Sequence, residues 1–256
     1  MNRIISIAKN TFREAVRDRV LYNLVFFVLL ITACAILLGD LTDGHEARTI
    51  VNIGLNAMLL FGAFIAIFVG VGLVSKEIEK RTVFAIFAKP VGRGEFIIGK
   101  YLGLCLTLAV NVVVMGIGVS LALLYVGGTG LAGTIWSTIL LIFLELTILT
   151  AVAILFSSFS SPALSALLTF FVFIIGHFSS SLRDLAANLG STSAIYFFEA
   201  VYYLLPNLSH FTFVTNAAHG EVPPAAMVLG AAMYAVVFDV ILMAATVIIF
   251  SRRNFK

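Results

Sequence analysis

Charged residues are scarce in this 256-residue sequence: only 11% are Asp, Glu, Lys or Arg, whereas 61% are hydrophobic. A soluble domain typically carries about 25% charged residues. The mean hydropathy is +1.10. These figures exclude a water-soluble globular protein, a disordered chain and a nucleic-acid-binding protein. Long unbroken apolar runs, without the alternation of a β-barrel strand, predict an all-α polytopic membrane protein.

Cysteines and catalytic motifs are also scarce. Cys34 and Cys105 lie inside apolar runs, and neither has a spacing to histidine that is typical of a metal site. The sequence contains neither an HExxH nor a GxSxG motif. We therefore expect no enzyme activity, no metal and no cofactor on this chain itself.

Six apolar segments are long enough for membrane spans, which need about 20 residues each. They cover residues 21–38, 51–75, 101–126, 135–156, 162–178 and 225–250. The sequence indicates a single transmembrane domain over residues 1–256, with no soluble domain. A lipoprotein-like cleavage box ends at Cys34, but the apolar run continues beyond it, which favours a retained first span.

The basic residues predict the orientation. Of the 16 Lys and Arg residues, five lie in 1–20, six in 76–100 and three in the C-terminal tail; only Arg48 and Arg183 lie elsewhere. Because basic residues collect on the cytoplasmic side, both termini and the 76–100 loop are predicted to be cytoplasmic. The 179–224 segment is then extracytoplasmic. Its apolar stretch 194–205 is too short for a seventh span and predicts outer-surface or re-entrant helices.

The basic N-terminal segment 1–20 predicts an interfacial helix. One face of the predicted helix is apolar and carries Ile4, Ala8, Phe12, Ala15 and Val16 at helical spacing. The other face is polar and carries Asn10, Arg13 and Arg17. Such a helix lies flat on an anionic cytoplasmic leaflet. The alternative is a solvated basic flank that only fixes the topology.

Residues 76–100 form the longest charged connector. Val83, Ile86 and Phe87 recur at i, i+3 and i+4, and Pro90 with the following glycines ends this helical stretch. The GEFIIGKY stretch at 94–101 nearly matches a phosphate-binding loop, but Tyr101 replaces the required Ser or Thr. We instead expect Lys100 to anchor the third span at the headgroups, and Gly99 with Gly103 to allow close helix packing.

This connector resembles the ABC-2 type permease subunits, particularly the branch of the nitrous-oxide-reductase maturation permeases. The matching positions are Glu77, Thr82, Phe84 to Phe87, Pro90 to Arg93 (Pro-Val-Gly-Arg), Gly99 and Lys100. The opening FREAVRDRVLYNL at 12–24 also resembles that family. Arg81 stands where many members have Gly.

The resemblance implies that residues 77–93 form a coupling helix that contacts a separate cytoplasmic ATPase subunit, which would hold the ATP and magnesium. It also implies a second permease chain, identical or similar, and a bacterial inner-membrane location. The residues expected to contact the ATPase are Glu77, Lys80, Arg81, Thr82, Phe84, Phe87, Lys89, Pro90 and Arg93.

Two acids lie inside predicted spans: Glu145 in the fourth and Asp239 in the sixth. A carboxylate at bilayer depth must face protein or water. It is either part of a substrate or proton site, or a hydrogen-bonded contact between helices. Asn56, Asn111 and His177 are the candidate partners.

Three hypotheses follow. The favoured one is the permease subunit of an ATP-driven exporter, with membrane lipid around it. The second is a membrane anchor or scaffold that docks a cytoplasmic protein of a cell-envelope machine without transport. The third is an ion-driven secondary transporter centred on Glu145 and Asp239.

Overall fold

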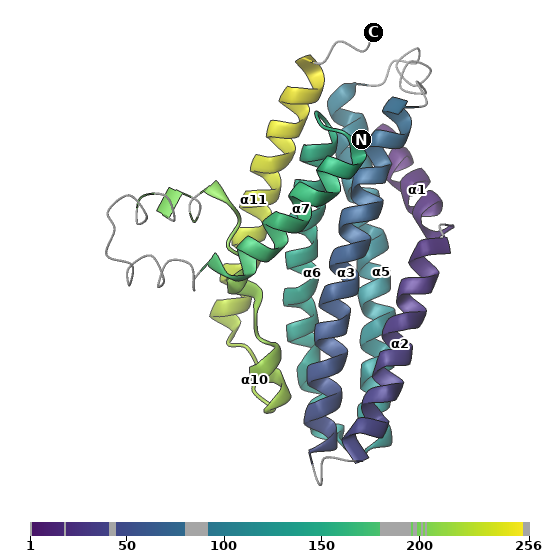
Figure 1. Ribbon diagram of the computed structural model, residues 1–256, viewed down its shortest axis with the longest axis vertical. Helices are drawn as coiled ribbons and strands as arrows, with labels where there is room; N and C mark the ends of the chain where they lie inside the picture. The colour runs from purple at the N-terminus through teal and green to yellow at the C-terminus, as the bar shows by residue number, and fades with distance from the viewer. Residues whose placement is uncertain are drawn as a thin grey trace.

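A computed structural model describes residues 2–17, 19–40, 45–79, 92–179, 196, 199, 200, 202 and 204–252. All regular structure in this part of the chain is helical, which confirms the all-α prediction (Figure 1). The elements are α1 (Asn2–Val16), α2 (Arg19–Asp40), α3 (Glu46–Glu79), α5 (Arg93–Tyr125), α6 (Thr129–Ser157), α7 (Pro162–His177), η1 (Leu208–Phe211), α10 (Val214–Ala218) and α11 (Ala225–Arg252).

Four helices are long and apolar enough to cross a membrane: α3, α5, α6 and α11. They cover four of the predicted spans, except that α5 ends one residue before its span does. Each helix is longer than its span; α3 has 34 residues and α5 has 33. At about 1.5 Å per residue each is about 50 Å long, which exceeds a hydrocarbon core of about 30 Å. The 22-residue α2 and the 16-residue α7 occupy the other two predicted spans.

The helices form an elongated bundle (Figure 1). We call the end where α3 ends and α5 begins the coupling end, and the opposite end the far end. The start of α1 and the end of α11 also lie at the coupling end. Helix α6 is central, because 72% of its most apolar 18-residue stretch is buried. In the corresponding stretch of α11, which lies at the periphery, only 22% is buried.

Three glycines at eight-residue spacing bring α3 against its neighbours. A Cβ at Gly62 would lie 2.6 Å from Leu146 of α6, closer than any ordinary contact. A Cβ at Gly54 would lie 2.9 Å from Val119 of α5. At Gly70 it would lie 3.1 Å from Ala153 of α6. The small residues therefore let α3 pack closely against its neighbours over its middle half, from Gly54 to Gly70, as is common between membrane helices.

The segment after α7 packs back against the bundle. Helix α10 contacts α3 and α6, and η1 contacts α6 and α7. Leu208 and Phe211 of η1 are buried in the main hydrophobic cluster. A Cβ at Gly176 near the end of α7 would lie 2.8 Å from the Pro206 carbonyl oxygen. The buried side chains within residues 205–218 are thus part of the core.

Candidate functional site

The predicted coupling segment is only partly described. Glu77 lies in the last turn of α3, and Arg93 is the first residue of α5. The remaining predicted contacts lie outside the described residues: Lys80, Arg81, Thr82, Phe84, Phe87, Lys89 and Pro90. Helices α3 and α5, which flank this segment, contact each other directly.

Arg93 joins the start of α5 to the end of α11. Its guanidinium donates to the carbonyl oxygen of Ser251 at 2.6 Å and to that of Phe250 at 3.4 Å. A cation at a helix C-terminus is stabilised by the helix dipole and by the unpaired carbonyls there. The rings of Phe96 and Phe250 also stack, with centroids 6.1 Å apart. Arg93 therefore has a structural role within the chain, in addition to the predicted ATPase contact.

A second hydrophobic cluster fills the coupling end of the bundle. It joins α3, α5, α6 and α11 through Val74, Phe96, Ile97, Ala151, Ile154, Met243 and Phe250. These four helices therefore pack as one block near the residues where α3 ends and α5 begins.

Helix α1 packs along the first turns of α5 and confirms the predicted close packing at Gly99 and Gly103. A Cβ at Gly99 would lie 2.7 Å from Ile7. A Cβ at Gly103 would lie 2.6 Å from both the Ala8 carbonyl oxygen and the Cβ of Thr11. The face of α1 that carries Ile7, Ala8 and Thr11 therefore packs against α5.

Lys100 is buried between these two helices. Its side chain is only 3% exposed, and its Nζ lies 3.4 Å from Oε2 of Glu14 on α1. The same Nζ lies 5.7 Å from the centre of the Phe96 ring. The prediction that Lys100 anchors the span at the lipid headgroups is therefore wrong. Its ion pair with Glu14, 86 residues earlier in the sequence, keeps the side chain inside the protein.

Glu145 of α6 faces His177 of α7, one of its predicted candidate partners. Glu145 is 1% exposed, and its Oε1 lies 3.4 Å from Nε2 of His177. Nδ1 of His177 lies 3.2 Å from the Phe173 carbonyl oxygen and donates to it. Nε2 of a neutral imidazole is then an acceptor, so a proton must lie between Nε2 and Oε1 for the two groups to attract.

Asp239 of α11 contacts α6 on the side opposite to Glu145. The hydroxyl of Thr147 donates to its Oδ2 at 3.0 Å, and the side chain of Tyr101 on α5 also interacts with the carboxyl group. The contact thus ties the peripheral α11 to two central helices. Thr147 and Tyr101 are ordinary residues of apolar helices, and no local sequence pattern indicates them.

The two other candidate partners bind within their own helices. Nδ2 of Asn111 donates to the Thr107 carbonyl oxygen at 2.8 Å. Nδ2 of Asn56 donates to both the backbone oxygen and the Oδ1 of Asn52, at 2.8 and 2.7 Å. Both Asn52 and Asn56 are exposed on the surface of α3.

A groove lies between α3 and α7 and begins about 12 Å along α3 from Asn56. It encloses about 330 Å³ and is lined by Phe64, Ile67 and Phe68 of α3 and by α7 residues that include Leu167 and Phe170. The rings of Phe64 and Phe68 are 6.1 Å apart and stacked. The groove wall is apolar and uncharged.

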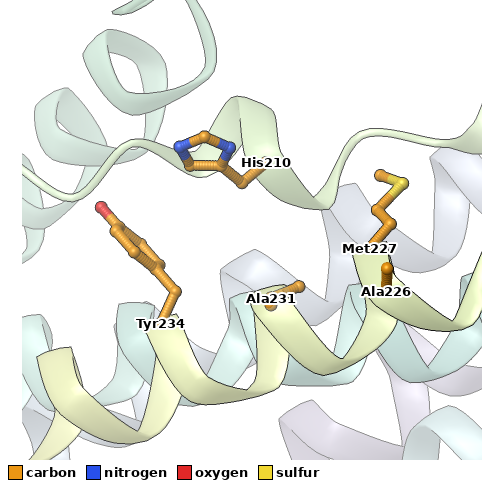
Figure 2. A pocket seen from close by; sticks show the side chains of 6 residues that line it. His210, Ala226, Met227, Ala231 and Tyr234 are labelled. Atoms are coloured by element: carbon orange, nitrogen blue, oxygen red, sulfur yellow. The ribbon is translucent and has the colours of Figure 1, made fainter.

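A second cavity, of about 320 Å³, lies between η1 and the start of α11. Figure 2 shows His210 on one side of it and Tyr234, Ala231 and Met227 of α11 on the other. The Tyr234 hydroxyl accepts from the backbone N–H of Asn207 at 2.8 Å. The Asn207 side chain in turn accepts from Ser179 and Ser209, so this cavity is braced by a polar network.

Four long apolar helices with polar groups between them define a multi-pass integral membrane protein. The described residues contain no cluster of three His, Cys, Asp or Glu side chains that could hold a metal ion. A family model described as ABC-2 family transporter protein matches residues 5–254. The chain therefore belongs to the ABC-2 transporter family and is a permease subunit of an ABC transporter, a component that in general works with an ATPase subunit. A comparison with curated proteins finds no match. The narrower resemblance to the nitrous-oxide-reductase branch stays a prediction.

Proposed function

We propose that this chain is the six-span permease of an exporter, that its transport pathway runs along the exposed face of α3 and the α3–α7 groove, and that a second permease chain completes this pathway. The observation that carries the proposal is the exposed amide pair Asn52 and Asn56 on an apolar helix.

The amide pair argues against lipid contact at this face. Each amide has more hydrogen-bonding groups than the two hydrogen bonds from Asn56 to Asn52 satisfy. Polar side chains inside a membrane face water or protein, because hydrocarbon cannot hydrogen-bond with them. We therefore infer that water, substrate or a second chain covers the face of α3 that carries Asn52 and Asn56.

The aromatic groove lies further along α3, toward the coupling end. Asn52, Asn56, Phe64 and Phe68 follow one another at multiples of four residues. Each four-residue step turns about 40° around the helix, so these residues form a stripe that winds around α3 from the amides to the groove. A path with amides at one end and stacked phenyl rings at the other suits an uncharged, partly apolar substrate. The same helix enters the coupling segment at its other end.

Two features support coupling to an ATPase at residues 77–93. The segment connects α3, which carries the proposed pathway, to α5, which holds α1 and α11. The start of α1 and the end of α11 lie at the same end of the bundle (Figure 1), as expected if both termini and this loop are cytoplasmic. A partner moves the bundle only if it binds one state more tightly than the other.

Cysteine accessibility tests the pathway. In a Cys34→Ala, Cys105→Ala background, Asn56→Cys is expected to react with a membrane-impermeant maleimide, or to form a cross-linked dimer on oxidation. The matched control is Val114→Cys, at an exposed position on α5. Val114 lies about 16 Å from the last residue of α5, and Asn56 lies about 15 Å from the first residue of α3, so the two positions are at a similar distance from the far end of the bundle. The control position faces lipid in this proposal, so it should do neither.

The proposal is wrong if Asn56→Cys neither reacts nor cross-links, or if Val114→Cys behaves in the same way. A scaffold that docks a cytoplasmic protein without transport would give that result, because its α3 face needs neither water nor a second chain.

A further inference from the structure

We propose that the exposed basic face of α1 is a binding site for anionic lipid headgroups, held in a fixed position by the docking of α1 on α5. The inference does not depend on transport, only on the chain being a membrane protein.

Helix α1 has three distinct faces. Its docked face carries Ile7, Ala8 and Thr11, which meet Gly99 and Gly103 of α5. A second face is basic: Lys9, Arg13 and Arg17 are all exposed and follow one another at four-residue steps.

The third face is apolar and lies beside the basic one. Ile5 is 58% exposed, and Phe12 and Val16 on the same side are half-buried. A membrane surface offers both chemistries at once, since apolar side chains enter the acyl boundary while Lys and Arg reach the headgroups.

The charges of α1 are not balanced within the helix. Like charges at i and i+4 repel one another and destabilise a helix. The acid within α1 is Glu14, whose carboxylate lies beside buried Lys100 of α5. The three cations therefore form a stripe whose repulsion an anionic surface would relieve, which is the charge complementarity that a phosphodiester headgroup provides.

The position of the stripe also fits a membrane surface. Arg17 is separated by one residue from the start of α2, the helix that carries the first predicted span. Because α1 packs on α5 through close glycine contacts, the stripe has a defined place relative to the bundle and is not a loose arm.

The test is lipid titration of the purified full chain in detergent, followed by native mass spectrometry, with phosphatidylglycerol and phosphatidylcholine as probes. Arg13→Gln with Arg17→Gln is expected to weaken phosphatidylglycerol binding about 30-fold, since each cation near an anionic surface contributes about fivefold. Binding of phosphatidylcholine should not change. The control, Arg48→Gln with Arg252→Gln, removes the same charge from exposed sites on other helices and should have a much smaller effect.

Three results would overturn the proposal: unchanged phosphatidylglycerol binding in the double variant, an equal loss in the control, or loss of a co-purifying ATPase subunit with lipid binding intact. The last result would assign the face to a protein partner.

A second measurement tests whether the apolar side of α1 faces the membrane. The chain has one tryptophan, Trp136, so a Trp136→Phe background allows a single reporter. In brominated phosphatidylglycerol, Ile5→Trp should be quenched strongly and Asn10→Trp, an exposed position on the polar side, weakly. Equal quenching at the two positions would contradict a membrane-facing apolar side of α1.

Discussion

Gly103→Ala tests whether the docking of α1 on α5 is as close as the structure has it. The added methyl group would lie 2.6 Å from the Ala8 carbonyl oxygen and 2.6 Å from the Cβ of Thr11, where ordinary contacts begin at 3.4 Å. One obstacle is backbone, which cannot rotate away. The two helices must therefore separate locally by about 0.8 Å, the difference between these two distances, to remove the overlap.

The cost follows from that separation. A radial gap of about 0.5–1 Å forfeits a quarter to a half of the dispersion energy of the contacts concerned. Overpacking of this kind typically costs about 1–3 kcal/mol. We therefore expect the free energy of unfolding to fall by about that amount, and the Glu14–Lys100 pair to be weakened as well.

Gly133→Ala is the matched control. It is the same substitution in a long helix, but a Cβ at Gly133 has no atom within 4 Å. Alanine is a better helix former than glycine by about 1 kcal/mol, so this variant should be as stable as the parent or more stable.

Thermal unfolding in detergent and limited trypsin digestion measure the effect. Each kcal/mol corresponds to about 2–4 °C in Tm for a chain of about this size. A displaced α1 should also be cut faster at Lys9, Arg13 and Arg17. If Gly103→Ala matches the parent in both assays while Gly133→Ala is folded, the close contact between α1 and α5 does not exist in the protein.

Two further predictions concern the acid in the core and the coupling segment. His177→Ala is expected to lower the free energy of unfolding by about 1–3 kcal/mol, because it leaves buried Glu145 without the imidazole that faces it. Adding Glu145→Leu should recover part of the loss in Tm. A double variant that is no more stable than His177→Ala alone would contradict the pairing. Arg81→Glu is expected to reduce the amount of ATPase subunit that co-purifies with the permease, while membrane insertion of the permease stays normal. Arg48→Glu, at the far end, should not reduce it. Equal recovery of the ATPase from both variants would count against coupling at residues 77–93. Arg93→Glu is less informative, since it also removes the hydrogen bonds to the end of α11.

Local sequence patterns predicted the features that depend on local chemistry. Long apolar runs located the helices, because a membrane span is a property of about 20 consecutive residues. The spacing of Gly99 and Gly103 predicted a close helix contact, since glycine on one face removes the side chain that would hold a neighbour away. The charge distribution predicted the grouping of the two termini with the 76–100 loop.

Long-range polar contacts were not predictable in the same way. Arg93 binds carbonyl groups more than 150 residues later, and Asp239 binds Thr147 on another helix. Lys100 matched the pattern of an interfacial lysine, and only the position of Glu14 in space makes it a buried partner. Exposure of the Asn52 and Asn56 amides likewise depends on which neighbours pack against α3, which no periodicity of α3 alone determines.

The close contact of Gly62 with Leu146 lies near the midpoint of α3 and has a mechanical consequence. If α3 tilts as a rigid rod about this midpoint, its two ends move in opposite directions. The close contacts at Gly54 and Gly70, each about 12 Å from Gly62, then move about half as far as the ends. With a half-length of about 25 Å, a tilt of about 5° displaces each end of α3 by about 2 Å. Under the proposed coupling, a pull on Glu77 in one direction would move Asn52 in the opposite direction. A small movement at one membrane surface would then change the width of the proposed pathway near the other surface.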